Sequence, residues 1–144
     1  MTSIREVGGT GGKPFNFNGI ETGTLLKRIQ VWEGDSQIKA VMVWLTDDRS
    51  EQFGVMAGSQ REFTFEKDEI FTSLSLWPDE DGTHLGAIKF TTNVGNQFYA
   101  SMKSGTLQAE VKVDVATGKC IGIQGRSGAA INSFGFIMVK MLSA

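Results

Sequence analysis

Hydrophobic and polar residues alternate along almost the whole chain, and this period of two restricts the fold more than any other feature of the sequence. A period of two is that of a β-strand, whereas an amphipathic helix needs apolar residues three and four positions apart, and no convincing stripe of that kind is present. Residues 26–32 and 37–47 both alternate, and Glu33-Gly34-Asp35-Ser36 between them predicts a tight hairpin. The chain is therefore predicted to be all-β.

Further strands are predicted where short alternating runs are bounded by Gly, Asp, Asn or Ser. These runs cover residues 61–65, 70–77, 85–92, 97–102, 108–115, 119–124 and 134–141. The 18 glycines and 2 prolines supply the turns, and no segment has the composition of a linker. A chain of 144 residues with 40% hydrophobic content is long enough for one packed domain and too short for two of ordinary size. We expect a single domain over residues 1–144.

Three segments of the chain resemble one another weakly, which indicates three related β units. They are residues 38–43, 85–90 and 120–125. Trp32 precedes the turn before the first copy and Trp77 precedes the turn before the second, whereas Val115 takes that place before the third. Three antiparallel units that each need an apolar face covered pack most simply as three sheets around a shared core. The repeats therefore predict a β-prism.

The charge of the chain and its apolar runs exclude several classes of partner. The formal net charge is -2, from 14 basic and 16 acidic residues, and no basic block could neutralise a run of phosphates, so nucleic acid is not expected as a partner. No window approaches the roughly 20 apolar residues that a membrane-spanning helix needs. Residues 1–10 lack the basic and apolar regions of a signal peptide, so synthesis in the cytosol is expected.

The reactive residues of the chain do not form a catalytic or metal-binding pattern. Cys120 is the single cysteine, which excludes an internal disulfide and favours an ordinary strand position. His84 has no second histidine or cysteine at ligand spacing, so a turn residue is expected and no zinc site. The acidic run 79–81 could hold calcium but lacks a long oxygen-ligand loop, so a solvated hairpin tip is favoured. We expect no enzyme activity, metal or cofactor.

Two glycine-rich segments predict a ligand site. Gly8-Gly9-Thr10-Gly11-Gly12 lies near the start of the chain, and Gly125 to Phe136 combines small residues and one amide before an apolar strand. Such loops present backbone N–H groups without the entropic cost of ordering a side chain, and a pyranose offers paired hydroxyls that both donate and accept. If the fold brings the two segments together, they predict a sugar pocket. The alternative for the first segment is a flexible turn.

The same segments carry a family resemblance. The glycine-rich opening, the repeated hairpin and Gly-Arg-Ser-Gly-x-x-Ile-Asn-x-x-Gly-Phe at 125–136 resemble the jacalin-related lectins, over essentially the whole chain. Residues 37–41, 71–77 and 85–90 are similar to the amino-terminal lectin module of fish natterin-like, aerolysin-type proteins. The resemblance implies a β-prism I fold of three four-stranded antiparallel sheets with pseudo-threefold symmetry. It also implies a domain that binds mannose-type or galactose-type sugars without metal and without chemistry on the ligand.

The resemblance also assigns sites, residue by residue. The sugar-binding positions that it implies are Gly11, Gly12, Gly128, Ala129, Ala130 and Asn132. The rim positions that it implies, in the neighbouring loop, are Trp77, Pro78 and Asp79. Asn132 stands where the family has an aspartate, and a neutral amide in place of a charged acceptor is expected to weaken binding by about 1 to 3 kcal/mol. Arg126 is expected to be a solvated or structural residue outside the site.

Two further functions stay open beside a mannose-binding lectin. Asn132, Ala129 and Ala130 offer little to a ligand, which is compatible with a prism that has lost sugar binding and serves protein contacts. The natterin-like similarity is compatible with a targeting module of a pore-forming assembly, which would need a partner chain or a further carboxy-terminal segment. A homo-oligomer would add avidity. Contact with extracellular or microbial glycans would then follow unconventional release from the cell.

Overall fold

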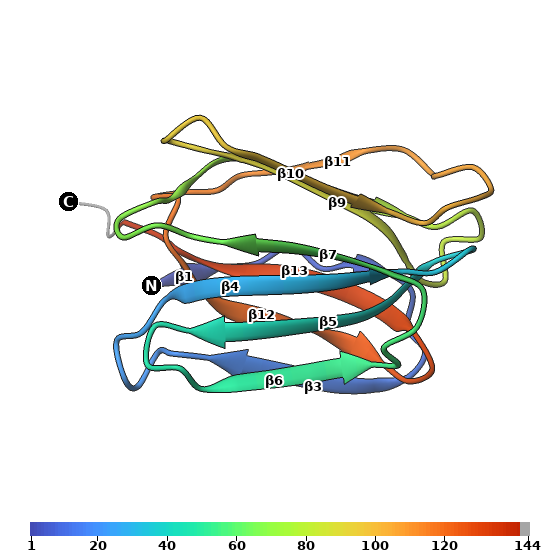
Figure 1. Ribbon diagram of the computed structural model, residues 1–144, viewed down its shortest axis with the longest axis horizontal. Helices are drawn as coiled ribbons and strands as arrows, with labels where there is room; N and C mark the ends of the chain where they lie inside the picture. Colours follow the sequence, from blue (N-terminus) through green and yellow to red (C-terminus); the bar gives the residue numbers. More distant parts are fainter. Residues whose placement is uncertain (142–144) are drawn as a thin grey trace.

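The computed structural model describes residues 1–141, and within them all regular structure is β-strand (Figure 1). The strands are β1 (Thr2–Ser3), β2 (Val7–Gly8), β3 (Lys13–Asn18), β4 (Leu26–Glu33), β5 (Ile38–Leu45), β6 (Ser50–Gly54), β7 (Ser59–Thr64), β8 (Phe71–Pro78), β9 (Leu85–Thr92), β10 (Gln97–Ser101), β11 (Val111–Val113), β12 (Cys120–Ser127) and β13 (Ile131–Val139). The described residues contain no helix that could cross a membrane.

The strands form three antiparallel sheets that face one another across a shared core (Figure 1). The strand orders are β6-β5-β4-β7, β10-β9-β8-β11 and β1-β13-β12-β3, and β2 also pairs with β13. β1 and β2 pair with the same edge of β13 in one unbroken register, since Ser3 lies opposite Met138 and Gly8 opposite Ser133. The two short strands thus act as one interrupted fourth strand. The predicted β-prism of three four-stranded sheets is confirmed.

The central hairpin of each sheet, β4–β5, β8–β9 and β12–β13, carries the same two irregularities. One break in register falls near the start of the first strand, and the second falls just before its end. The later breaks lie between Trp32 and Glu33, between Trp77 and Pro78, and between Arg126 and Ser127. Bulges increase the local twist of a strand and redirect its end. These matching breaks define the pseudo-threefold relation, in which Arg126 takes the place of the two tryptophans.

The predicted third repeat was assigned to the wrong strand. Residues 38–43 and 85–90 lie in β5 and β9, the second strands of their hairpins, but residues 120–125 lie in β12, the first strand of the third hairpin. Val115 therefore precedes the turn from β11 to β12 and is not equivalent to Trp32. The apolar run Cys120-Ile121-Gly122-Ile123 matches the other copies in composition only. The third copy of the second strand is β13.

Some strands were missed or misplaced at their ends. β1, β2, β3 and β6 were not predicted, because β1 and β2 are two residues long and the outer strand β6 is largely exposed and shows no alternation in burial. The strand predicted over 108–115 shrinks to Val111–Val113, and the strand predicted over 134–141 begins earlier, at Ile131. The sequence pattern thus identifies strands with one buried face and misses those held mainly by backbone pairing.

Phenylalanine rings from all three sheets fill the centre of the prism. Phe90 of β9 lies 5.1 Å from Phe63 of β7 and 4.7 Å from Phe71 of β8, measured between ring centroids. Phe136 of β13 closes the third side at 5.2 Å from Phe71. Edge-to-face and tilted pairs at these distances each contribute about 0.5 to 1.5 kcal/mol of stability beyond that gained by burying the rings. Phe90 is fully buried and links the sheets.

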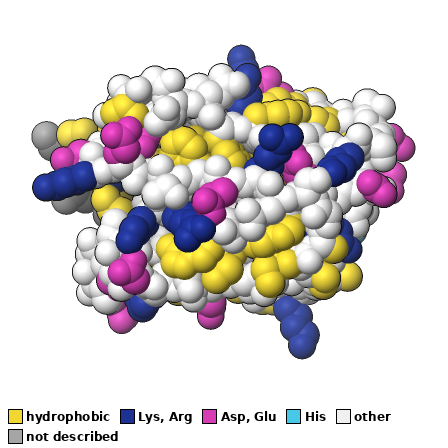
Figure 2. All heavy atoms as spheres, in the orientation of Figure 1, with side chains coloured by type: hydrophobic (Ala, Val, Ile, Leu, Met, Phe, Trp, Pro, Cys, Tyr) yellow, Lys and Arg dark blue, Asp and Glu magenta, His cyan; other side chains and the backbone are white. Residues whose placement is uncertain are grey.

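Three hairpin turns lie together at one end of the prism, and β1 and the end of β13 lie at the other (Figure 1). These turns are residues 34–37, 79–84 and 128–130, each following the first strand of a central hairpin. Acidic and basic side chains are mixed over the face of the molecule in Figure 2, without a continuous field of one sign. The clustered turns are therefore the part of the fold where segments far apart in the sequence meet.

Truncation of the central ring should reveal how far the three sheets depend on one core. Phe90→Ala is expected to lower the free energy of unfolding by about 3 to 5 kcal/mol, because a large ring is lost from a site that the other rings cannot refill. Urea unfolding followed by tryptophan fluorescence measures this change. Val94→Ala, at a half-exposed turn position, is the control and should change stability by less than about 0.5 kcal/mol. A loss below 1 kcal/mol in Phe90→Ala would contradict a shared core.

Candidate functional site

The two glycine-rich segments meet at Asn132, the second residue of β13. The N–H of Gly9 donates to the main-chain carbonyl of Asn132 at 2.7 Å. Gly12 has a φ of +73°, and a Cβ placed on it would collide with the side-chain oxygen of Asn132 and lie 2.7 Å from the carbonyl oxygen of Ser127. Only glycine combines this left-handed conformation with such close packing. The predicted meeting of the two segments is therefore a feature of the fold.

Arg126 holds the first glycine segment in place. Its Nε donates to the carbonyl of Gly11 at 3.0 Å and its Nη2 donates to the carbonyl of Gly12 at 2.9 Å. A guanidinium is planar and offers several donors in a fixed fork, so one side chain can bind two successive carbonyls. The expectation that Arg126 is a structural partner is confirmed. This explains why arginine replaces tryptophan at this position of the third hairpin.

The turn between β12 and β13 is closed by its own backbone. The N–H of Gly128 donates to the carbonyl of Ala130 at 3.0 Å, so it is not free to donate to a ligand as the family resemblance implied. Ala129 is exposed and Ala130 is buried. Within residues 1–141 the N–H of Ala129 has no backbone or side-chain acceptor. The N–H of Ala130 likewise has no acceptor within these residues, but Ala129 is the exposed residue of the two.

The side chain of Asn132 has its two polar ends in different surroundings. A Cβ added to Gly12 would meet Oδ1 and one added to Gly128 would lie 3.8 Å from it, so the amide oxygen faces the two glycine segments. Nδ2 lies 3.4 Å from Nε2 of His84, across from the turn between β8 and β9. The amide oxygen of Asn132 thus lies beside Gly12 and Gly128, whereas its NH₂ group lies beside Gly11, where an added Cβ would be 3.0 Å from Nδ2, and beside His84.

His84 in turn contacts a buried carboxylate. Its Nδ1 lies 3.5 Å from Oδ2 of Asp79 and 3.0 Å from Oγ1 of Thr83. Asp79 is only 5% exposed, and its Oδ1 accepts the backbone N–H groups of Thr83 at 3.0 Å and His84 at 3.2 Å. The Asp79 carboxylate therefore shapes the turn from the inside. The rim contact that the resemblance implies for Asp79 stays a prediction.

The other two predicted rim residues lie beside the turn. Trp77 packs edge to face against Tyr99, with ring centroids 6.1 Å apart. The carbonyl of Pro78 accepts the N–H of Gln108 at 3.2 Å, which ties the turn to the segment before β11. Both residues are half-buried at the end of β8. Trp77 and Pro78 are thus engaged in contacts with residues of their own sheet and of the segment before β11.

An acidic hollow borders His84 on the side away from Asn132. It has a volume of about 250 Å³, and its lining includes Asp79, Glu80, Asp81, Thr83 and His84. Glu80 is tied down at its edge, because its carboxylate accepts the N–H of Thr106 at 2.9 Å. The run 79–81 thus belongs to an ordered turn. Within the described residues, no three His, Cys, Asp or Glu side chains gather as a set of metal ligands.

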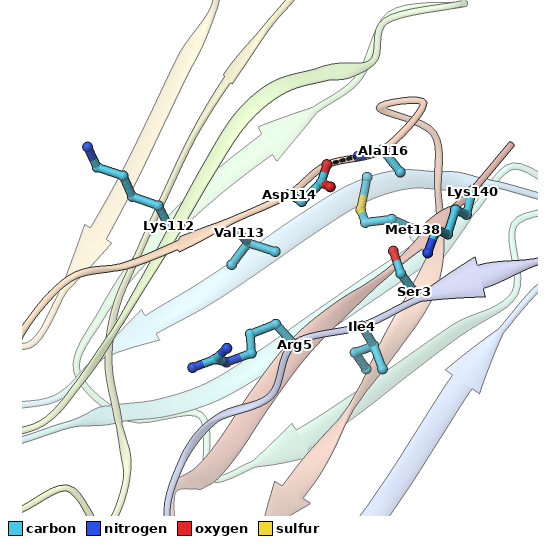
Figure 3. Close-up of a pocket in the computed structure, with 9 residues that line it drawn as sticks. All are labelled: Ser3, Ile4, Arg5, Lys112, Val113, Asp114, Ala116, Met138 and Lys140. Atoms are coloured by element: carbon cyan, nitrogen blue, oxygen red, sulfur yellow. Dashed lines mark hydrogen bonds between the residues drawn. The ribbon is translucent and has the colours of Figure 1, made fainter.

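A basic hollow of about 360 Å³ lies toward the other end of β13, between β1 and β11 (Figure 3). Arg5, Lys112 and Lys140 contribute to its lining, and the carboxylate of Asp114 is engaged by the N–H of Ala116 at 2.8 Å. The three cationic side chains point in different directions and do not converge on one point (Figure 3). This hollow contains none of the predicted site residues.

The single thiol of the chain is not a nucleophile. Cys120 lies at the start of β12, is buried, and donates to the carbonyl of Gly122 at 3.3 Å. Burial raises the pKa of the Cys120 thiol to about 12, so the thiolate is not formed at neutral pH. The expectation of a packed strand residue is confirmed. Cys120 is therefore not part of the candidate site, whose groups around Asn132 are hydrogen-bond donors and acceptors.

Sequence reasoning identified the glycine segments and Asn132 and missed the role of His84. His84 was expected to be a turn residue, which it is, but its contact with Asn132 spans 48 positions of the chain. A lone histidine between Thr83 and Leu85 carries no local signal for such a contact. The contact between His84 and Asn132 follows from the pseudo-threefold fold, which places the turn between β8 and β9 beside the start of β13.

Comparisons with known proteins agree with this architecture. The family model of the jacalin-like lectin domain matches residues 4–137. A crystal structure of a lamprey immune protein shares 45% sequence identity with the chain at a TM-score of 0.96, covering 99% of this chain and 46% of that one. The chain thus spans less than half the length of that relative. No curated protein sequence matches the chain.

Two plant lectins share the fold at lower identity. Malaysian banana lectin is 23% identical with a TM-score of 0.77, covering 98% of this chain and 99% of that one. A mannose-binding jacalin-related lectin from Ananas comosus is 18% identical with a TM-score of 0.75, covering 97% of this chain and 99% of that one. At these identities the similarity is one of fold.

Replacement of the fork of Arg126 tests whether it orders the first glycine segment. Arg126→Lys keeps the charge but cannot donate to two carbonyls in the same geometry, so the segment should open more readily. Loss of about 1 to 3 kcal/mol of local stability corresponds to amide exchange at Gly9 that is roughly 5- to 150-fold faster. Arg28→Lys, at the distant pair with Trp44, is the matched control. Unchanged exchange at Gly9 in Arg126→Lys would show that the segment orders itself.

Proposed function

Because the chain belongs to the jacalin-like lectin domain family, we propose that it binds mannose-type glycans between the two glycine segments, without metal and without chemistry on the ligand. Membership of this family supports carbohydrate binding in general. The observation that carries the proposal is the position of Asn132 Oδ1, which faces Gly12 and Gly128. The absence of side chains at Gly12 and Gly128 lets both glycine segments approach this acceptor closely, so that backbone groups and the acceptor lie together at the surface.

The groups around this acceptor complement a pyranose. Asn132 Oδ1 accepts from a sugar hydroxyl, and the free N–H of Ala129 donates to a neighbouring one. Arg126 and the backbone of Gly128 are already engaged, so they hold the loops and do not bind the ligand directly. A rigid site of this kind loses little entropy on binding. Gly11 and Gly12 serve by the absence of side chains, and Ala130, which is buried, serves by closing the turn.

Affinity for a single sugar is expected to be weak. Asn132 is neutral, and a hydrogen bond between neutral groups contributes about 0.5 to 1.5 kcal/mol, against about 1.5 to 3 kcal/mol for one to a charged group. Linking several weak sites can raise the overall avidity by about 10² to 10⁴. We therefore also propose that the domain acts in a multivalent form, either as a homo-oligomer or as part of a larger assembly.

Mannose is the proposed ligand because one structural relative, the lectin from Ananas comosus, is described as mannose-binding. The similarity to a lamprey immune protein favours glycan recognition in defence, where cell-surface or microbial glycans are the targets. Exposure to such glycans after cytosolic synthesis and unconventional release stays part of the proposal.

A second candidate function is that of a targeting module in a pore-forming assembly, with sugar binding weakened or lost. The similarity to the lamprey immune protein favours this function, because the chain covers only 46% of that protein, in which the matching domain is joined to a further segment. Glycan arrays that remain blank, together with leakage of liposomes when the domain is joined to its partner segment, would support this function over the first.

A minimal substitution at Gly12 tests the location of the site. Gly12→Ala places a methyl group against the Asn132 oxygen and the Ser127 carbonyl, so methyl α-mannoside binding is expected to fall below detection by calorimetry. Gly23→Ala is the matched control, because Gly23 has a φ of +69° with nothing within 4 Å, and it carries a similar backbone strain of about 1 to 2 kcal/mol. Equal loss in both variants, or in neither, would remove Gly12 from the site.

Restoring the family carboxylate tests the role of Asn132. Asn132→Asp keeps the size of the side chain and supplies a charged acceptor, so mannoside binding should tighten by roughly 5- to 150-fold, or about 1 to 3 kcal/mol. Isothermal titration at pH 7.5 measures the change. Asn16→Asp, at an exposed position of β3, controls for the added negative charge and should leave affinity unchanged. Equal or weaker binding by Asn132→Asp would exclude Asn132 as the acceptor.

A further inference from the structure

The acceptor of the proposed sugar site has an orientation that the glycine segments do not fix. An asparagine amide can turn by half a rotation and exchange its oxygen and nitrogen at nearly the same positions. Within residues 1–141, the one hydrogen-bonding partner of the Asn132 side chain is Nε2 of His84, at 3.4 Å. If Nε2 of His84 accepts, the NH₂ group of Asn132 faces it and the oxygen faces Gly12 and Gly128. If Nε2 donates, the two ends of the amide exchange places.

The groups around Nδ1 of His84 determine whether its Nε2 accepts or donates a hydrogen bond. Its Nδ1 faces a carboxylate oxygen of Asp79 at 3.5 Å and the hydroxyl of Thr83 at 3.0 Å. A proton on Nδ1 donates into this acceptor-rich side, and the neutral ring then has an unprotonated Nε2. Nε2 accepts from the Asn132 NH₂ group, and the Asn132 oxygen is left facing Gly12 and Gly128.

We propose that His84 is a positioning residue for Asn132, and that protonation of His84 reverses the Asn132 amide and makes sugar binding depend on pH. This inference rests on the proposed function. Protonation adds a second N–H to an imidazole, at the ring nitrogen that was unprotonated. Nε2 of His84 would then donate, so the Asn132 oxygen must turn toward it. The NH₂ group then takes the place of the oxygen beside Gly12 and Gly128, and at that position Asn132 offers a donor in place of an acceptor.

The charged groups around His84 are compatible with such a protonation. Asp79, in direct contact, is the counter-ion of the protonated ring, and Glu80 and Asp81 line the same hollow. The segments at 36–37 and 102–105 border that hollow with Ser36, Gln37, Met102, Ser104 and Gly105, which are uncharged. On the side of Asn132, Arg126 is held by two carbonyls of the first glycine segment, and Glu6 accepts from Ser133 at 3.1 Å.

The composition of the chain makes this proposal unusually easy to test. His84 is the single histidine among 144 residues. A change at the Asn132 amide that coincides with one at the His84 ring can therefore be followed at a single imidazole.

The first experiment needs no sugar. Nuclear magnetic resonance of the full chain between pH 5 and pH 8 follows the ring protons of His84 and the side-chain NH₂ group of Asn132. The expected result is one shared midpoint for both signals. In His84→Gln, whose amide can still pair with Asn132 but does not titrate, the Asn132 signal should stay constant. An Asn132 amide that does not follow His84 would overturn the proposal.

The second experiment measures affinity for methyl α-mannoside, a ligand without titratable groups. Binding by the unmodified chain should be about 3- to 10-fold weaker at pH 5.5 than at pH 7.5, the effect of one neutral hydrogen bond. His84→Gln should bind equally at both pH values. Binding that is the same at both pH values in the unmodified chain, or that falls equally in His84→Gln, overturns the proposal while the proposed function stands. If Asn132 follows His84 but no mannoside binds at either pH, the positioning role stands and the proposed function fails.

Discussion

Each sheet of this protein has one apolar face, and only the other two sheets can cover it. A sheet becomes stable when its apolar face packs against another layer, and here each sheet packs against the other two. Three sheets close the core, and the rings of Phe71, Phe90 and Phe136 fill the point where they meet. Because this core determines where each hairpin ends, it also determines which turns meet outside it.

The candidate site arises where one of three related hairpins departs from the other two. Trp32 and Trp77 stand before the late bulge of their strands, and each packs among neighbouring residues of its own end of the prism. Arg126 stands at the same bulge of the third strand and binds carbonyls of the first glycine segment instead. At this position of the third hairpin, a guanidinium thus supports the first glycine segment where the other two hairpins have a packed tryptophan.

The sequence was sufficient to predict the β-prism, because buried strands such as β5 and β9 alternate strongly and their turns carry glycine or aspartate. It was not sufficient for β6, where backbone pairing on an outer strand leaves side chains exposed, or for the phase of the third repeat, where β12 and β13 are both apolar. The glycine segments and Asn132 were predicted by motif. The contacts of Arg126 and His84 were not specified by any local pattern, since they span 115 and 48 positions.

β1 and the end of β13 meet at one end of the prism, where Lys140 donates its N–H to the carbonyl of Met1, while the glycine segments lie at the other. Attachment to a surface beside Met1 or Lys140 would therefore leave the glycine segments facing outward. On a sensor surface or a multivalent scaffold, every attached copy would present the same face to solution. The geometry of the first and last strands therefore makes the fold suited to dense, uniformly oriented display, whatever sugar it binds.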